Sequence, residues 1–440
     1  MKKFASLALA LVLTAGLFGC SGTSSSSAAG SASGTAADEP VTIQFMHGMV
    51  EQERQEVIQG LIDEFEEANP NITVEQIPTD DSNFDTKVTA LAGSGELPAL
   101  IEVNQNRAKM LAKDELIDYD AVRTVIDSRG DDTYYDNILK INTTEDGQNY
   151  IGVPVGGWVQ GIWYDKEAFE EKGLEAPTTW ENILAAAQAF YDPDNRQYGI
   201  ALPTVEGSFS EQSFSQFALS NNANVFDADG NVTFNTPEMV EALTFYQELY
   251  QYSIQGSNDT TEVQDAFLNG SAPMAIYSTY ILSGVNEAGM MDRLGFAVPE
   301  NKSSASYGSV GMITVTADLD DAQRQAAIKF LEYLITNESN IKWLHMAPGG
   351  QQPVLPSVAT DEAYLDNETI QSFSHLSEDI SGAFDSIQLF GIVDGKNFLS
   401  MGDVTSSGVI SRAVNAVTVK GEDPQTVAES TQSEIEDLVD

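Results

Sequence analysis

Two kinds of hydrophobic spacing alternate along residues 41–103, and this alternation restricts the fold more than any other feature of the chain. Alternate apolar residues predict two strands, and a short continuous apolar run predicts a third, buried strand. Apolar residues at helical spacing fill both gaps between these strands. The predicted strands are 41–45, 72–74 and 99–103, and the predicted helices run through 57–65 and 88–91. Strands that alternate with helices predict an α/β fold with a parallel sheet covered by helices.

Helical spacing returns in the second half of the chain. Thr178-Thr179-Trp180-Glu181 predicts a capping box at the start of one helix. Thr236-Pro237 predicts the start of another, because proline fits the first helical position. Residues 326–334 predict a further helix. The α/β pattern therefore extends well beyond the first hundred residues.

The composition limits the domain count and the possible partners. The chain has 440 residues, of which 42% are hydrophobic, so it is long enough for two or three domains with real cores. Its 67 acidic and 21 basic residues give a formal net charge of -46. Such a chain is not expected to bind nucleic acid, because phosphates select Lys and Arg. Cys20 is the only cysteine, so neither an intrachain disulfide nor a structural zinc site built on several thiolates is possible.

The first 19 residues have the features of a secretory signal peptide, with Lys2 and Lys3 ahead of an apolar stretch. A cysteine at the cleavage point is what a lipoprotein needs, because its thiol carries the lipid. Residues 20–39 are mostly Ser, Gly, Ala and Thr, a composition typical of a flexible tether. The alternative is that Cys20 is an ordinary buried thiol. We expect export, lipidation at Cys20 and attachment to the outer face of a membrane.

Several stretches stand out together for their order and spacing. They are Phe65–Val74, Gly93–Pro98, Tyr164–Trp180, Phe267–Ser278 and Ala327–Gly350, followed by Gly421, Pro424 and Ala428. In this order they resemble the signatures of bacterial extracellular solute-binding proteins, family 1. These proteins are the binding components of ABC importers, most often for sugars. The resemblance covers nearly all of residues 41–440, and it rests on the order of the motifs, since each alone is weak.

The resemblance implies a two-lobed periplasmic-binding-protein-like fold, with two parallel-sheet lobes joined by a hinge that the chain crosses three times. We place lobe 1 at 40–155 plus 297–346 and lobe 2 at 159–295 plus 353–440. The implied function is an extracytoplasmic lipoprotein that captures a carbohydrate, an oligosaccharide by expectation, and delivers it to an ABC permease. The implied partners are the sugar and the permease subunits. We expect a monomer on a Gram-positive cell surface, with no cofactor, no metal and no enzymatic activity.

Sugar binding needs aromatic rings for the apolar faces of the sugar and polar groups for its hydroxyls. Ligands of open α/β sheets lie beyond the carboxyl ends of strands and between domains. At such predicted loop and hinge positions the candidate binding residues are His47, Phe84, Asn104, Gln105, Trp158, Ser278, Tyr280, Gly311 and Gln351. Other roles remain open, such as packing in the hinge for Trp158, helix packing for Phe84 and a helix cap for Ser278. Trp163 and Trp180 are predicted core residues.

Two features leave a second ligand class open. Ala99 replaces an aspartate that is common in the family, and His47-Gly48-Met49 follows the first strand. Both resemble the branch that binds glycerol-3-phosphate and its diesters. That branch uses a late arginine for phosphate, whereas residues 397–402 contain none and only Lys396 and Arg412 flank them. A glycerophosphodiester is therefore the alternative, and a surface glycoside hydrolase or adhesin is a minor one.

Motifs for catalysis or metal binding are weak. His47, His345 and His375 are far apart in the sequence. Asp227, Asp229 and Asn231 imitate the start of a calcium loop, but Val232 replaces the required glycine. These patterns favour a binding protein without a metal.

Overall fold

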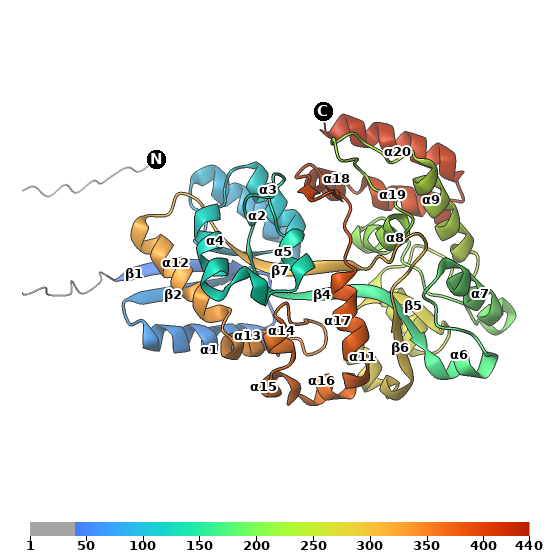
Figure 1. The fold of residues 1–440 in the computed structure, drawn as a ribbon, viewed down its shortest axis with the longest axis horizontal. Helices are drawn as coiled ribbons and strands as arrows, with labels where there is room; N and C mark the ends of the chain where they lie inside the picture. The colour runs from blue at the N-terminus through green and yellow to red at the C-terminus, as the bar shows by residue number, and fades with distance from the viewer. Residues whose placement is uncertain (1–39, 440) are drawn as a thin grey trace, which may run out of the picture. The chain divides into compact units, whose positions relative to one another are not determined.

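The computed structural model describes residues 40–439, without the side chains of residues 81, 82 and 136. The predicted signal peptide, Cys20 and the predicted tether lie outside these residues. The strands are β1 (Val41–His47), β2 (Ile72–Pro78), β3 (Leu100–Val103), β4 (Val153–Asp165), β5 (Met274–Ser278), β6 (Leu294–Ala297), β7 (Tyr307–Val315), β8 (Ile392–Val393) and β9 (Lys396–Asn397). The three strands predicted before residue 104 and both intervening helices are confirmed (Figure 1).

Helices surround these strands. The first half of the chain contributes α1 (Gln52–Ala68), α2 (Asp81–Ser94), α3 (Gln105–Lys113), α4 (Tyr119–Arg129), α5 (Asp136–Lys140), α6 (Lys166–Lys172), α7 (Trp180–Phe190) and α8 (Ser208–Ser220). The second half contributes α9 (Pro237–Tyr250), α10 (Thr260–Leu268), α11 (Ile281–Glu287), α12 (Asp321–Leu334), α13 (Asn337–Leu344), α14 (Pro356–Ala359), α15 (Glu362–Leu365), α16 (Glu368–Ser372), α17 (Ser377–Asp385), α18 (Met401–Ser407), α19 (Val409–Thr418) and α20 (Pro424–Val439). Within residues 40–439 no helix combines the length and apolar character needed to span a membrane.

The main sheet has the strand order β2-β1-β3-β7-β4-β5, with β6 also paired to β4. β1 is parallel to β2 and to β3, as predicted. All other pairs in this sheet are antiparallel. The α/β class is therefore confirmed, but the sheet is mixed, and the expectation of two parallel sheets is corrected. Strands buried on both faces are apolar in either direction, so their pattern does not reveal their orientation.

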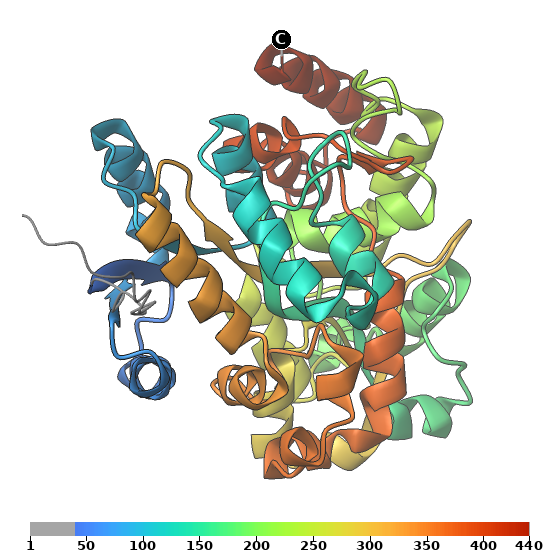
Figure 2. The same cartoon turned by 60° about the vertical axis from the view of Figure 1, so that its left-hand side comes forward.

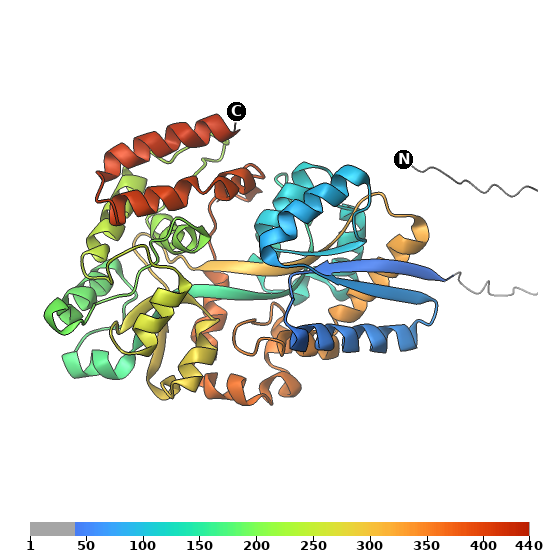
Figure 3. The same cartoon turned by 180° about the vertical axis from the view of Figure 1, so that it is seen from behind.

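β4 connects the two halves of the sheet because it changes partners along its length. Residues up to Gln160 pair with β7, and residues from Gln160 onward pair with β5. Figure 3 shows the long strands β4 (green) and β7 (orange) side by side. A segment far along the chain joins β4 as well, since the Gly157 and Gln352 backbones exchange hydrogen bonds of 3.0 and 2.7 Å. The middle of β4 thus lies where distant segments meet. The exact lobe boundaries stay predictions.

The hydrophobic core consists of two clusters. One surrounds β1, β3 and β7 under α1, α4 and α12, and extends to α10 and α11. The other lies among α7, α8, α9, α19 and α20. Trp163 is fully buried and Trp180 is 9% exposed, so both are core residues as predicted. Their indole N–H groups donate to the Tyr277 carbonyl and the Ser220 hydroxyl, which satisfies their polar atoms.

Polar side chains fix the ends of the helices. Thr236 caps α9 as predicted, because its hydroxyl accepts from the Met239 N–H. The capping box predicted for α7 is wrong, since Thr179 is the capping residue and accepts from the Asn182 N–H. Thr178 stays outside the helix because its carbonyl accepts from the Glu300 N–H at 2.7 Å.

An ion pair joins two helices that cover the first cluster. Asp118 caps α4 and receives two hydrogen bonds from Arg324 of α12, the shorter at 2.6 Å. α12 lies alongside α4 in Figure 2. A planar guanidinium suits such a double contact with a carboxylate.

Candidate functional site

A pocket of about 480 Å³, here called the central pocket, opens where several strand ends and helix starts meet. Residues after β1 and β3 line one side, together with the start of α3. The middle of β4, the start of α8, the first half of β7 and Gln351 line the rest. The site is thus assembled from segments up to three hundred residues apart.

A second pocket of about 560 Å³, here called the adjoining pocket, shares Trp158, Ser208 and Gln212 with the central pocket. The ends of β5 and the start of α10 complete it. Trp158 therefore lines two adjacent spaces. Each space lies within the size range of sites for organic ligands, roughly 300–1,000 Å³.

Seven of the nine predicted binding residues line these two pockets. Asn104, Gln105, Trp158, Gly311 and Gln351 line the central pocket. Ser278 and Tyr280 line the adjoining pocket. Their contact with a ligand stays a prediction.

The aromatic side of the site centres on Trp158, which is partly exposed in the middle of β4. Its ring lies 5.6 Å from the ring of Tyr307, at an interplanar angle of 40°. In the adjoining pocket the rings of Phe209 and Tyr277 pack edge-on at 5.4 Å. Burial raises the pKa of the Tyr307 and Tyr280 hydroxyls, so both stay protonated and can donate hydrogen bonds. These rings offer apolar faces next to polar groups.

Two of the predicted polar residues already serve the fold. The Asn104 side chain caps α3 by accepting from the N–H groups of Asn106 and Arg107. Gln105 is 3% exposed, and its amide N–H₂ donates to the Gly308 carbonyl at 3.0 Å. Its oxygen accepts from Ser309 and from the backbone of β7. Gln105 therefore holds α3 against β7, whereas the capping role of Asn104 uses only its side-chain oxygen and not its amide N–H₂.

His47 does not face either pocket. Its side chain is fully buried, because Ile43, Phe45 and His47 are two residues apart and share the buried face of β1. The Met49 N–H donates to its Nδ1, and its Nε2 lies 3.2 Å from the Gln76 side-chain oxygen. Burial lowers the pKa of His47 to about 4, with the Gln76 contact opposing this. At this end of β1 the central pocket is lined by Gly48, Met49 and Val50, and not by the buried His47 side chain that the sequence analysis named.

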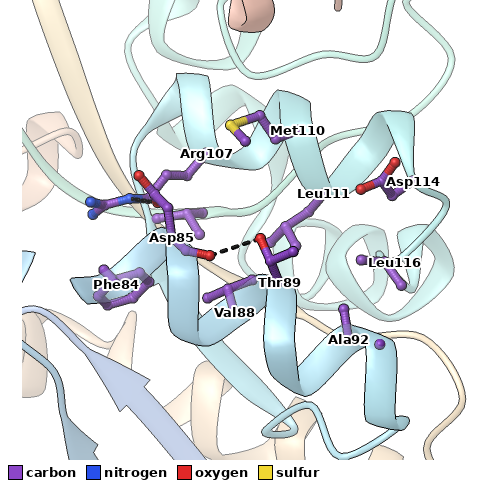
Figure 4. A pocket seen from close by; sticks show the side chains of 12 residues that line it. Phe84, Asp85, Val88, Thr89, Ala92, Arg107, Met110, Leu111, Asp114 and Leu116 are labelled. Carbon is purple, nitrogen blue, oxygen red and sulfur yellow. Dashed lines mark hydrogen bonds and ion pairs between the residues drawn. The ribbon is translucent and has the colours of Figure 1, made fainter. Parts of the chain in front are cut away.

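Phe84 also lies elsewhere. It is fully buried and lines a separate cavity of about 330 Å³ between α2 and α3 (Figure 4). The Arg107 guanidinium lies 4.4 Å from the centre of its ring and donates to Asp85 at 2.6 Å. The ring packs the two helices together, which is the helix-packing role that the sequence left open for it.

Sequence reasoning missed several residues of the site. Tyr307 and Ser309 lie on β7, and Ser208 and Gln212 lie on α8. Glu102, at the end of β3, accepts from the Gly48 N–H at 2.9 Å and so joins two adjacent strand ends. Glu102 could have been predicted as a site residue, because it lies two residues before Asn104 at the same strand end. No local pattern marked Ser208, Gln212 or Tyr307.

The central pocket carries an excess of negative charge. Glu51, Asp80 and Glu102 line it, against Arg107 as the one basic residue in its lining. Lys396 and Arg412, the cations named for a phosphate, line none of the described pockets near β4. Lys396 donates to the Ala228 carbonyl at 2.6 Å. Arg412 pairs with Glu434 and donates to the Ser407 carbonyl, so both cations have other partners.

In the part of the chain that the structure describes, no three His, Cys, Asp or Glu side chains are placed to hold a metal ion. The aspartates at 227 and 229 form a turn instead, in which Asp227 accepts from the N–H groups of Asp229 and Asn231 at 2.9 Å.

Comparison with known proteins gives matches that span most of the chain. The family model of bacterial extracellular solute-binding proteins matches residues 60–372. YcjN of Escherichia coli (strain K12), provisionally assigned as an ABC transporter periplasmic-binding protein, is 47% identical over 400 residues, covering 91% of this chain and 93% of YcjN.

Solved structures agree in fold. Maltose-bound MalE3 of T. maritima has a TM-score of 0.72 at 19% identity, covering 90% of this chain and 99% of MalE3. The cyclic alpha-maltosyl-1,6-maltose binding protein of Arthrobacter globiformis has a TM-score of 0.73 at 20% identity, covering 91% and 99% of the two chains. The two-lobed α/β fold expected from the sequence is thereby confirmed.

Proposed function

Because this chain belongs to the bacterial extracellular solute-binding protein family, we propose that it captures a carbohydrate between its lobes and delivers it to an ABC permease. The carbohydrate is an oligosaccharide, and the protein binds it without chemical change.

The observation that carries this proposal is the pair of adjacent pockets that both have Trp158 in their lining. Together they have room for more than one sugar ring, at about 480 and 560 Å³. Trp158, Tyr307 and Tyr280 offer rings for the apolar faces of a sugar. Ser208, Gln212 and nearby carboxylates offer partners for hydroxyls.

Ligands of related proteins support the same class. MalE3 of T. maritima was solved with maltose, and the Arthrobacter globiformis protein binds cyclic alpha-maltosyl-1,6-maltose. Both share only the fold with this chain, so the particular sugar has to be found by experiment.

Capture works through residues that come from distant parts of the chain. A ligand that contacts Gln351, α8 and the end of β3 at once binds a closed arrangement better than an open one. Closure of the lobes then follows from this difference in affinity.

The glycerophosphodiester alternative has less support. A phosphate in the central pocket would face Glu51, Asp80 and Glu102. Arg107 is the one basic residue in this lining, and it is paired with Asp85. A neutral sugar meets no such repulsion.

Membrane attachment through a lipid on Cys20 is part of the proposal. With a body of this acidity, attachment has to come from the lipid, because anionic headgroups repel the protein. Cys20→Ala should release the protein from the membrane fraction, and unchanged fractionation would count against a lipid anchor. The Gram-positive setting stays a prediction.

Thermal unfolding of residues 20–440 tests the ligand class. We would add maltose, maltotriose, ribitol and glycerol-3-phosphate separately. A bound ligand stabilises the folded state by about 2.7 kcal/mol at one hundred times its dissociation constant. A higher midpoint with the sugars supports the proposal, and a shift with glycerol-3-phosphate alone supports the alternative. Hydrolysis of a glycan by the pure protein would favour the hydrolase.

A further inference from the structure

A small cavity opens beside the central pocket, between α3, α8 and α18. We call it the side cavity, and its volume of about 20 Å³ gives room for one group of the size of water. It shares Gln105, Asn106 and Tyr307 with the central pocket. These three residues therefore form the boundary between the side cavity and the central pocket.

Lys109 of α3 lines this cavity and is 1% exposed. Its ammonium makes no hydrogen bond or ion pair with any residue between 40 and 439. α18 covers it closely, since a Cβ on Gly402 would lie 3.7 Å from the Cβ of Lys109. Burial lowers the pKa of Lys109 to about 8, so the side chain is mostly charged at neutral pH. A buried charge without a partner destabilises the folded state.

Glu211 of α8 lines the same cavity and is 7% exposed. The Thr405 hydroxyl of α18 donates to its Oε1 at 2.7 Å. Burial raises the pKa of Glu211 to about 7, and the Thr405 contact opposes this. Although Lys109 and Glu211 line one cavity, no ion pair between them is formed in the described structure. The cavity thus offers a donor on one wall and an acceptor on another.

We propose that the side cavity is a subsite for one hydroxyl group of the bound sugar. This group accepts a hydrogen bond from the Lys109 ammonium and donates one to the Glu211 carboxylate. A hydroxyl suits the cavity because it is both donor and acceptor. A carboxylate or phosphate would face Glu211, and an ammonium group would face Lys109. The inference rests on the proposed function. It adds that the side cavity is the part of the site that selects a neutral sugar.

The stability of a Lys109 variant distinguishes a role in ligand binding from a purely structural role. Replacing a buried unpaired charge with an apolar side chain of similar length is neutral or stabilising. If Lys109 serves the ligand, Lys109→Met should therefore weaken binding while the sugar-free protein stays at least as stable. If Lys109 serves the fold, the same change should lower the sugar-free midpoint.

The experiment measures the dissociation constants of maltose and maltotriose by calorimetry, together with the sugar-free melting midpoint. The variants are Lys109→Met and Glu211→Gln, and the control is Lys329→Met on the exposed side of α12. We expect each test variant to raise the dissociation constant about tenfold or more, since each loses a hydrogen bond to a charged group. The control should bind like the wild type, and Lys109→Met should not lower the midpoint.

Three results would overturn the inference, and they are distinguishable. Unchanged affinity in both test variants, with normal binding by the wild type, removes the subsite alone. Weaker binding together with a lower sugar-free midpoint for Lys109→Met assigns the lysine to the fold. A wild type that binds neither sugar counts against the proposed function, and the subsite falls with it.

Discussion

Glu211→Gln should make the protein more stable at neutral and alkaline pH while leaving its stability almost unchanged in acid. Glu211 is 7% exposed on α8, and burial raises its pKa from the ordinary 4.5 to about 7. Gln keeps the oxygen that accepts from Thr405 at 2.7 Å but never carries the charge. The substitution therefore isolates the cost of burying the ionised carboxylate.

The size and sign follow from the pKa change. A rise from 4.5 to about 7 corresponds to about 3 kcal/mol, because each pKa unit is worth about 1.4 kcal/mol. Between these two pH values the folded protein holds a proton that the unfolded chain has released. The contribution of Glu211 to stability is therefore fully present below pH 4.5 and is lost as the pH rises towards 7. Above this window the loss is complete.

Urea unfolding at several pH values from 5 to 8 measures the effect. We expect the free energy of unfolding of Glu211→Gln, minus that of the wild type, to grow by about 1.4 kcal/mol per pH unit up to about pH 7 and then to level off. Glu287→Gln, which removes an exposed carboxylate at the end of α11, controls for the loss of one negative charge. Parallel pH profiles for Glu211→Gln and the wild type, or a difference that grows towards acid, would refute the reasoning.

Three further predictions concern other parts of the chain. Trp158→Ala should weaken sugar binding about tenfold with little change in stability, since the partly exposed ring lines both pockets. If calorimetry gives the variant and the wild type the same affinity, Trp158 is not part of the binding site. Gly199→Ala should unfold at a lower urea concentration, because the new Cβ would lie 2.0 Å from the backbone oxygen of Ala187. Gly60→Ala in α1 has free space for its Cβ, so its free energy of unfolding should rise by about 0.5–1 kcal/mol. The urea midpoints of the two variants test both expectations. Burial holds the pKa of His47 at about 4 in the folded state, below its ordinary 6.5. The contribution of His47 to stability is therefore present above pH 6.5 and is lost as the pH falls towards 4. In urea titrations, His47→Gln should lose less free energy of unfolding between pH 6.5 and 4 than the wild type does.

Local patterns predicted the elements well where the signal is short-range. The strands and helices of residues 41–103 are confirmed because periodic burial depends only on neighbouring residues. The direction of β4 and β7 was not predictable in the same way, since both are buried on two sides. The N-cap of α7 is Thr179 and not the predicted Thr178, because Glu300, distant in sequence, holds Thr178 outside the helix.

The candidate site was predicted in part for the same reason. The rule that ligands lie beyond strand ends located Asn104 and Gln105, and the glycine-rich stretch of β4 located Trp158. The same rule selected His47, although its spacing from Phe45 already placed it on the buried face.

The sequence by itself determined the family, the α/β class, the acidic character and the order of the first strands and helices, because these depend on composition, spacing and motif order along the chain. The tertiary structure alone decided which side chains meet at the site. Lys109 and Glu211 line one cavity only because α3, α8 and α18 pack there, about one hundred to three hundred residues apart in sequence. Burial in that packing, rather than the identity of either residue, raises the pKa of Glu211 and lowers that of Lys109.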